Sequence, residues 1–142
     1  MTARTISISA EQLAELEELA ERSLPAESCA FLLGAGADEA TAAIAVREVL
    51  PVENIDRSRV SFTMAPDDVL RAYQAAEERG LGVVGIFHSH PSVPSPSGTD
   101  ARFMEVNPVV WVIYSTTENR FSAWVFDDDG AIKKVEIVTG SP

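Results

Sequence analysis

The chain contains only two histidines, His88 and His90, and they stand two positions apart at the end of an apolar run. Side chains two positions apart in an extended strand point to the same side, so both imidazoles are predicted to face one site. Asp100 follows after a short loop. Two imidazoles and one carboxylate are the protein ligands that a catalytic Zn²⁺ uses when its fourth position is left for water. The residue types therefore predict a metal site made of His88, His90 and Asp100.

The loop between the histidines and Asp100 contains three prolines, at positions 91, 94 and 96. Prolines reduce the conformational entropy of the unfolded chain, so less entropy is lost when the loop folds and brings the Asp100 carboxylate to the histidines. A second interpretation stays open, because a His-x-His pair also arises by chance. The residues from Ser97 to Asp100 also match a helix N-cap followed by an acidic third residue.

A glutamate far upstream, Glu27, is the fourth candidate functional residue. It stands at the mouth of an apolar run, residues 29–33, which is bounded by Pro25 and Gly34 and is typical of a buried strand. At a strand start a glutamate commonly has no function. Beside a metal-activated water, however, a carboxylate can take up a proton during attack and return it to the leaving amine.

The composition limits the kinds of partner that the chain can have. It has 142 residues, 46% of them hydrophobic, which favours a single domain over residues 1–142. The 22 acidic and 11 basic side chains give a net charge of −11, which argues against nucleic acid or an anionic membrane surface as the main partner. A single cysteine, Cys29, excludes an internal disulfide. Since no signal peptide or transmembrane run is recognisable, a cytoplasmic location is expected.

The elements that must position these residues follow from hydrophobic periodicity and from helix start and stop signals. Ser9 and Gln12 form the sequence pattern of a capping box at the start of the first helix. The helices are predicted over residues 10–22, 66–79 and 97–106. The strands are predicted over residues 29–33, 41–50, 61–64, 81–87, 109–115, 120–126 and 131–138, with turns over 34–39 and 51–54. This order predicts an α+β (mixed α/β) domain with one curved sheet flanked by about three helices.

Other chemistries fit the sequence less well. A zinc deaminase would need a His-x-Glu motif with paired cysteines, and a zincin would need His-Glu-x-x-His, and neither is present. A serine triad would need a Gly-x-Ser-x-Gly elbow, which is also absent. A cysteine hydrolase would use Cys29 with a histidine, but Cys29 is predicted to lie inside a strand.

Taken together, these residues give the chain a resemblance to JAMM (MPN+) metallopeptidases, which are deubiquitinase- and desampylase-like enzymes. The resemblance rests on Glu27 at the start of an early strand, on the HSHP motif at residues 88–91 and on the Ser-x-x-Asp motif from Ser97 to Asp100. The neighbouring sequences at 25–29, 51–54 and 84–87 are also similar, so the resemblance covers residues 13–138. The family usually has six residues between the proline and the serine, whereas this chain has five.

The resemblance implies a fold similar to that of cytidine deaminases and an isopeptidase that cuts ubiquitin or ubiquitin-like proteins after their C-terminal Gly-Gly. It implies that His88, His90 and Asp100 hold Zn²⁺ and that Glu27 is the general base and then the general acid. Ser97 is expected to support the bound water or the developing oxyanion. Residues 55–64 take the place of a variable insertion in the family, so we expect them to face the substrate. The substrate tail is expected to be thin and to add as an extra strand at a sheet edge.

The chain is short, so it resembles archaeal or bacterial members more than large eukaryotic complexes, as a prokaryotic single-domain type similar to the proteasome lid deubiquitinase. A link to the proteasome or to sulfur metabolism is therefore a further expectation. Two alternatives remain: an enzyme that releases a ubiquitin-like sulfur carrier from a cysteine adduct, and a non-catalytic scaffold module. The sequence does not indicate the oligomeric state.

Overall fold

The computed structural model describes residues 3–36 and 42–139, so the turn predicted over 34–39 lies partly outside the described residues. Helices and strands follow the predicted order, with one additional strand at the start and without the strand predicted over residues 61–64. The elements are β1 (Thr5–Ser7), α1 (Ala10–Ser23), β2 (Cys29–Ala35), β3 (Ala43–Val52), α2 (Pro66–Glu78), β4 (Gly82–His90), α3 (Gly98–Val106), β5 (Val110–Ser115), β6 (Arg120–Phe126) and β7 (Ile132–Val138).

Each helix begins where its sequence signals predict. Ser9 Oγ accepts a hydrogen bond from the Gln12 backbone N–H, and the Gln12 side chain accepts one from the Ser9 N–H, which completes the capping box of α1. α2 begins with Pro66 at its first position, where the missing N–H has no cost, and Gly80 follows its end with a positive φ of 68°. The five glutamates of α1 are all exposed, as expected of a solvated helix face.

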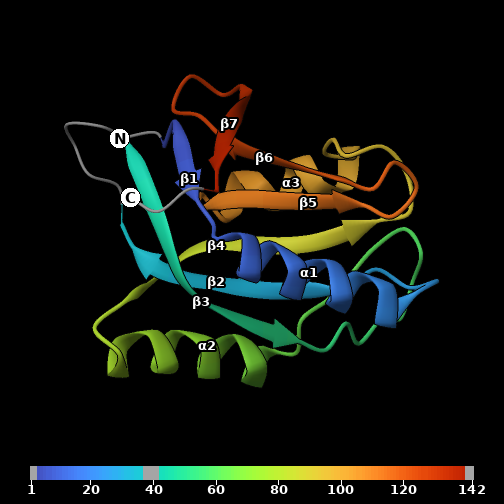
Figure 1. Cartoon of the computed structure of the whole chain (residues 1–142), viewed down its shortest axis with the longest axis horizontal. Helices are drawn as coiled ribbons and strands as arrows, with labels where there is room; N and C mark the ends of the chain where they lie inside the picture. The colour runs from blue at the N-terminus through green and yellow to red at the C-terminus, as the bar shows by residue number, and fades with distance from the viewer. Residues whose placement is uncertain (1–2, 37–41, 140–142) are drawn as a thin grey trace.

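The sheet is mixed and closes on itself. Its strand order is β1-β3-β2-β4-β5-β6-β7, and the three-residue β1 closes it by pairing in parallel with both β3 and β7. β4 and β5 are also parallel, and the remaining pairs are antiparallel. The predicted α+β class, with a curved sheet and three helices, is confirmed (Figure 1). The sequence prediction missed β1 because three residues are too few for a recognisable period.

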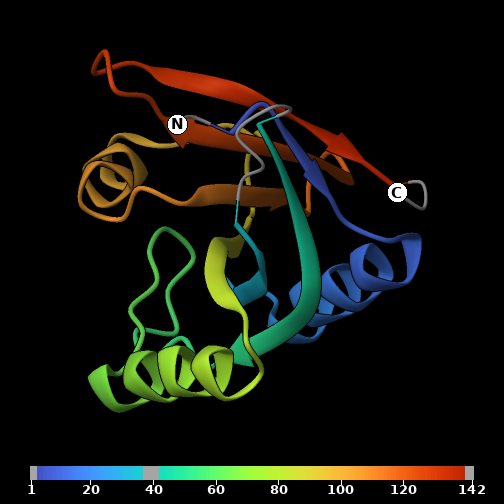
Figure 2. The ribbon, with the colours of Figure 1, turned by 90° about the vertical axis from the view of Figure 1, so that its left-hand side faces the viewer.

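Helices cover both surfaces of this sheet. Figures 1 and 2 show α1 on one side, with α2 and α3 on the other. Successive residues of a strand point to opposite surfaces, so Leu32 of β2 packs in the cluster with α1, while Phe31 and Leu33 pack with α2 and α3. We call these two surfaces the α1 face and the α2–α3 face. Leu16 and Ala20 of α1 are fully buried.

The structure corrects three predictions in the region around the site. Residues 61–64 are a loop and not a strand, and residues 51–52 extend β3 where a turn was predicted. The histidine strand β4 is paired on both sides, with β2 and β5, so it offers no free edge for an added strand. The loop forms because the Asn54 side chain accepts a hydrogen bond from the Thr63 N–H, and the Ile55 N–H donates to the Thr63 carbonyl. These bonds use backbone groups that a strand would need for a ladder.

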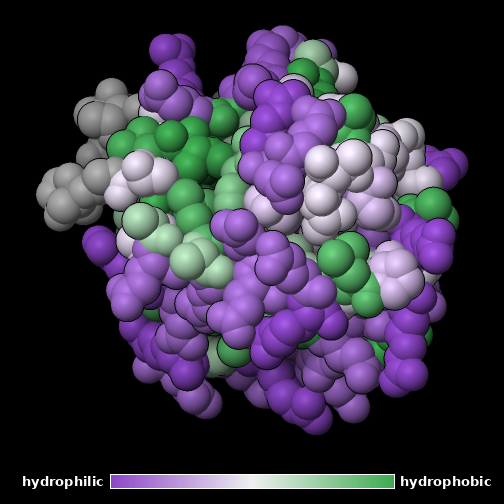
Figure 3. All heavy atoms as spheres, turned by 45° about the vertical axis from the view of Figure 1, so that its right-hand side comes forward, coloured by the Kyte–Doolittle hydropathy of each residue, from purple (hydrophilic) through white to green (hydrophobic). Residues whose placement is uncertain are grey.

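One face of the molecule is mainly hydrophilic (Figure 3), in keeping with the excess of acidic residues. Figure 3 shows one side of the molecule, on which hydrophilic residues predominate and hydrophobic ones form small separate groups. Within the described part of the chain, no helix combines the length and the apolar character needed to cross a membrane.

Candidate active site

Glu27 and His88 meet because their strands are neighbours. β2 and β4 pair antiparallel with Cys29 opposite His88, and Glu27 lies two residues before Cys29, hence on the same α2–α3 face. His88 Nδ1 lies 3.2 Å from Glu27 Oε1, and both side chains are almost completely buried. The backbone of β2 is tied to β4 just beyond this pair, where Ser89 Oγ accepts from both the N–H and the hydroxyl of Ser28.

Asp100 reaches the same cluster from the first turn of α3. Its Oδ2 lies 3.5 Å from His88 Nε2 and also accepts a hydrogen bond of 2.8 Å from the Ser97 N–H. The Asp100 N–H in turn donates to Ser97 Oγ at 3.1 Å. Ser97 and Asp100 therefore form a capping box at the start of α3, which confirms the predicted helix N-cap. The cap also fixes the carboxylate of Asp100 against His88.

His90 completes the group from the end of β4. Its Nδ1 lies 3.0 Å from the Val93 carbonyl oxygen, and its Nε2 lies 3.9 Å from Glu27 Oε2. A carbonyl oxygen only accepts, so His90 Nδ1 carries a proton, and in the neutral imidazole this tautomer leaves the lone pair on Nε2. The structure thus brings together Glu27, His88, His90 and Asp100, and it places Ser97 beside them at the helix cap.

This arrangement leaves donor atoms that fit a cation. Among the described residues, the buried side-chain atoms without a hydrogen-bond partner are Glu27 Oε2 and His88 Nε2. If His88 Nδ1 donates to Glu27, as His90 Nδ1 donates to Val93, both Nε2 atoms carry lone pairs near carboxylate oxygens. A histidine that ligates a metal donates its other ring N–H to a carboxylate or carbonyl in this way. The 3.5 Å between His88 Nε2 and Asp100 Oδ2 is close to the separation of about 3.4 Å between two ligands of a tetrahedral Zn²⁺.

The full set of ligands is nevertheless looser than an assembled metal centre. Over residues 3–36 and 42–139, no group of three or more His, Cys, Asp or Glu side chains has an arrangement that could hold a metal ion. The pairwise distances and the two unpartnered atoms support a cation, whereas a ready-made three-ligand cage is not present.

Two aromatic rings hold His88 in place, and sequence reasoning missed one of them. Phe62 stacks on the His88 ring with centroids 4.9 Å apart and an interplanar angle of 26°, and Trp111 meets it edge-on at 5.9 Å. Trp111 lies in β5, within a strand predicted from the sequence, and it is buried. Phe62 was assigned to a strand, and no local signal in the sequence marks its contact with a histidine 26 positions away.

The proline loop is fastened by serines that the sequence analysis did not single out. Ser115 Oγ at the end of β5 donates to the Ser92 carbonyl, and Ser122 Oγ of β6 donates to the Pro94 carbonyl. These bonds hold the shorter loop against two strands of the sheet. They fix the segment that connects His90 to Ser97.

Cys29 lies next to the cluster but is not suited to act as a nucleophile. Its thiol is fully buried and donates to the Val52 carbonyl at 3.3 Å. Burial, followed by the negative charges of Glu27 and Asp68, raises the pKa of the Cys29 thiol to about 12. Since a thiolate is the reactive form, this environment opposes the cysteine-hydrolase alternative.

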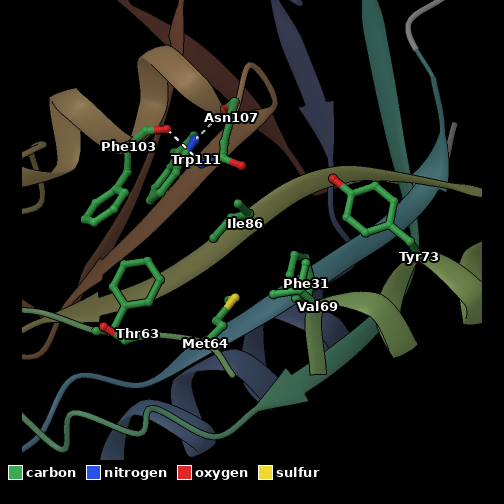
Figure 4. A pocket seen from close by; sticks show the side chains of 10 residues that line it. Phe31, Thr63, Met64, Val69, Tyr73, Ile86, Phe103, Asn107 and Trp111 are labelled. Atoms are coloured by element: carbon green, nitrogen blue, oxygen red, sulfur yellow. Dashed lines mark hydrogen bonds between the residues drawn. The ribbon is translucent and has the colours of Figure 1, made fainter. Parts of the chain in front are cut away.

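An apolar pocket of about 220 Å³ adjoins the cluster on the α2–α3 face. Figure 4 shows Met64 of the loop, Val69 and Tyr73 of α2, Ile86 of β4 and Trp111 of β5 around it. Phe62 lines the pocket and also stacks on His88, so the pocket and the buried cluster share a wall. The structure thus places three residues of the predicted substrate-facing segment, numbers 62–64, in the pocket lining.

Comparisons with known proteins place the chain in a family. The sequence model of a family described as prokaryotic homologues of the JAB domain matches residues 9–127. The chain is 37% identical over 113 residues to a desampylase of Pyrococcus furiosus, covering 79% of this chain and 75% of that protein. It is 36% identical over 73 residues to a probable TtuB-protein conjugate cleaving protease of Thermus thermophilus, covering 50% of this chain and 49% of that protein.

Solved structures show a similar fold. A solution structure of a Desulfitobacterium hafniense protein matches with a TM-score of 0.83 and 27% identity, over 97% of this chain and 94% of that one. A solution structure of a Salinibacter ruber protein matches with a TM-score of 0.67 and 29% identity, over 97% of this chain and 92% of that one.

Proposed function

This chain belongs to the family of prokaryotic homologues of the JAB domain, and from that premise we propose that it is an isopeptidase that removes ubiquitin-like modifiers. The relatives named as a desampylase and as a conjugate cleaving protease support a hydrolase that acts on protein conjugates. The proposed reaction is zinc-dependent hydrolysis after the C-terminal Gly-Gly of the modifier.

One observation carries the proposal. Glu27 and His88, from strands far apart in sequence, bury a carboxylate oxygen and an imidazole nitrogen that have no hydrogen-bond partner. Buried polar atoms are costly when they are left without a partner, so their retention points to a ligand or a reacting group between them. A scaffold module would have no use for such a cluster.

The residues that would hold a Zn²⁺ ion are His88, His90 and Asp100, because His88 Nε2 lies 3.5 Å from Asp100 Oδ2 and His90 Nε2 lies 3.9 Å from Glu27 Oε2 in the same cluster. When bound, the ion supplies Lewis acidity, which lowers the pKa of a coordinated water to about 7 and polarises a carbonyl group.

Glu27 is proposed to move the proton. Its Oε2 is unpartnered while Oε1 is fixed by His88, so one oxygen is oriented and the other is available to accept a proton and later donate it to the leaving amine. Ser97 Oγ accepts from the Asp100 N–H and still carries its own proton. We propose that this proton stabilises the oxyanion that develops on the scissile carbonyl.

The substrate tail is proposed to bind across the apolar pocket and the loop of residues 55–64. Since β4 has no free edge, the tail is held by this loop and by side-chain contacts rather than by pairing with the histidine strand. The pocket beside Phe62 would take an apolar side chain of the tail, with the small glycines next to the buried cluster.

The test is cleavage of defined conjugates by zinc-replete protein. The protein is incubated with a ubiquitin-like protein of the same organism joined to lysine through an isopeptide bond, to a cysteine adduct, or to an N-terminus. We expect release from lysine, loss of release with a chelator, and recovery with Zn²⁺, along with about one zinc per chain. Release only from cysteine would favour the sulfur-carrier alternative, whereas no release and no bound zinc would favour the scaffold.

A further inference from the structure

Asn54 is a buried polar residue that lies between the substrate-facing loop and Glu27. It follows the end of β3, is 8% exposed, and uses its whole amide group. Its Nδ2 donates to the carbonyls of Glu27 at 2.9 Å and of Ser61 at 3.2 Å. Its Oδ1 accepts from the N–H groups of Asp56 at 3.1 Å and of Thr63 at 3.0 Å. An amide has two donor and two acceptor positions, so all four are used.

These bonds join the loop to the backbone of Glu27. The Glu27 carbonyl accepts from Asn54, and the Glu27 N–H donates to the Ser58 carbonyl of the same loop at 2.7 Å. Both backbone groups of Glu27 are therefore held by residues 54–58. Glu27 precedes the first residue of β2 and lies outside the register that pairs β2 with β3 and β4.

The same amide group also fixes the pocket wall. Asn54 bonds to Ser61 and Thr63, the two residues on either side of Phe62. Phe62 lines the apolar pocket and stacks on His88. A side chain that fills the pocket and presses on Phe62 would thus act on Glu27 through one amide group.

We propose that Asn54 is a positioning residue that couples occupancy of the apolar pocket to the placement of the Glu27 carboxylate. The catalytic consequence of this coupling rests on the proposed function, whereas the mechanical link depends only on the contacts of Asn54. The residue touches neither the proposed ligands nor the pocket, so it acts through Glu27 and Phe62.

Asp56 provides a matched control in the same loop. Its Oδ2 accepts from the hydroxyls of Thr63 at 2.7 Å and Ser61 at 3.4 Å, and these exposed bonds stay within the loop. Asp56→Ala therefore loosens the loop without removing a bond to Glu27. Asn54→Ala loosens the loop and releases Glu27 as well.

Steady-state cleavage of the lysine conjugate separates the two roles. We expect Asn54→Ala to lower kcat by about tenfold or more, because a small misplacement of a catalytic group is costly, and to raise KM. Asp56→Ala should raise KM with kcat within about twofold of the wild type. If Asn54→Ala changes only KM, as Asp56→Ala does, Asn54 merely shapes the loop and the proposal fails.

Amide hydrogen exchange tests the link without any activity. The Glu27 N–H donates to the Ser58 carbonyl. Its exchange rate should rise about tenfold or more over the wild type in Asn54→Ala and stay at the wild-type value in Asp56→Ala. Unchanged exchange in both variants would overturn the proposal even if the wild type cleaves. If the wild type does not cleave, the proposed function fails, and the exchange measurement still decides this inference.

If Asn54→Ala does not fold, Asn54→Asp replaces it in both measurements. An aspartate can still accept from the N–H groups of Asp56 and Thr63, but it cannot donate to the carbonyls of Glu27 and Ser61.

Discussion

The α1 face and the α2–α3 face are built from alternate residues of the same strands, yet they bury different chemistry. The α1 face packs aliphatic side chains against Leu16 and Ala20. Its buried polar pair, Ser28 and Ser89, is hydrogen-bonded. The α2–α3 face has its own apolar cluster around Trp111, but at one end it carries the histidines and carboxylates described above.

This difference indicates that the α1 face mainly stabilises the fold, whereas one end of the α2–α3 face carries the functional site. Satisfied apolar packing contributes to the free energy of folding, whereas buried polar atoms without partners reduce it. Such costs are commonly accepted at functional sites, where stability and activity oppose each other. We therefore expect changes on the α1 face to alter stability with little effect on turnover, and changes in the cluster to do the reverse.

The largest expected effect comes from Asp100. Asp100→Ala should abolish both zinc retention and cleavage, because it removes the carboxylate that faces His88 Nε2 and also half of the α3 cap. Asp100→Asn is the control, since its amide oxygen can still accept from the Ser97 N–H while the charge is lost. Metal analysis of both proteins is the measurement. Stoichiometric zinc in Asp100→Asn would remove the carboxylate from the ligand set.

Glu27→Gln should lower kcat by about 10²–10⁴-fold, because an amide cannot take up the proton. Zinc content should stay at about one per chain. The melting temperature should not fall, since the variant replaces a buried carboxylate whose Oε2 has no partner. Cleavage assays and calorimetry on the same preparation check this. Turnover near the wild-type rate would exclude Glu27 as the general base.

Two serines with equal structural roles give a matched pair across the two faces. Ser9 caps α1 and Ser97 caps α3, each through a complete capping box. Each Ser→Ala change should cost about 1 kcal/mol of stability through the lost cap. Only Ser97→Ala should also slow cleavage, by about 10²–10³-fold, as the loss of an oxyanion donor does. Equal kinetics for both variants would make Ser97 a cap and nothing more.

Leu16→Ala, unlike the changes in the cluster, should lower stability and leave turnover nearly unchanged. The side chain is fully buried on the α1 face, so its truncation should cost about 2–5 kcal/mol in the free energy of unfolding. Cleavage per folded molecule should stay within about twofold of the wild type below the melting transition. Denaturant titration combined with kinetics is the check. A large loss of kcat in the folded variant would show that the two faces are not independent.

The smallest effect concerns Cys29 at alkaline pH. Its pKa is raised from 9.0 to about 12, so above pH 9 the unfolded chain loses a proton that the folded chain keeps. Stability should therefore fall as pH rises from about 9 to about 12, by about 1 kcal/mol per pH unit for this one group. Cys29→Ala lacks this contribution, so its loss of stability between pH 8 and pH 10 should be smaller. Parallel losses in both proteins would contradict the expected burial of the thiol.

The sequence predicted the parts of this molecule that depend on local signals. The capping boxes at Ser9 and Ser97, the proline at the start of α2 and the apolar strands all lie where their patterns indicate. The meeting of Glu27 with His88 was expected from the motif resemblance, and the strand register now accounts for it.

What could not be predicted depends on bonds between side chains and distant backbone. Asn54 was assigned to a turn, yet its amide replaces the ladder that residues 61–64 would otherwise need. The stacking of Phe62 on His88 follows from that loop and from no periodicity in the sequence. Closure of the sheet through β1 required knowing which strands become neighbours, which no local pattern records.

The place of β1 has a consequence for the order of assembly. Thr5 pairs with both Ala43 and Glu136, so the ribosome makes one of its partners soon after Thr5 and the other much later. Contacts so far apart in sequence form slowly, because a long loop must be closed before they stabilise anything. The earliest strand of the described chain thus has to wait for β7. Until then, the growing polypeptide exposes a seam that a chaperone or a second nascent chain could occupy.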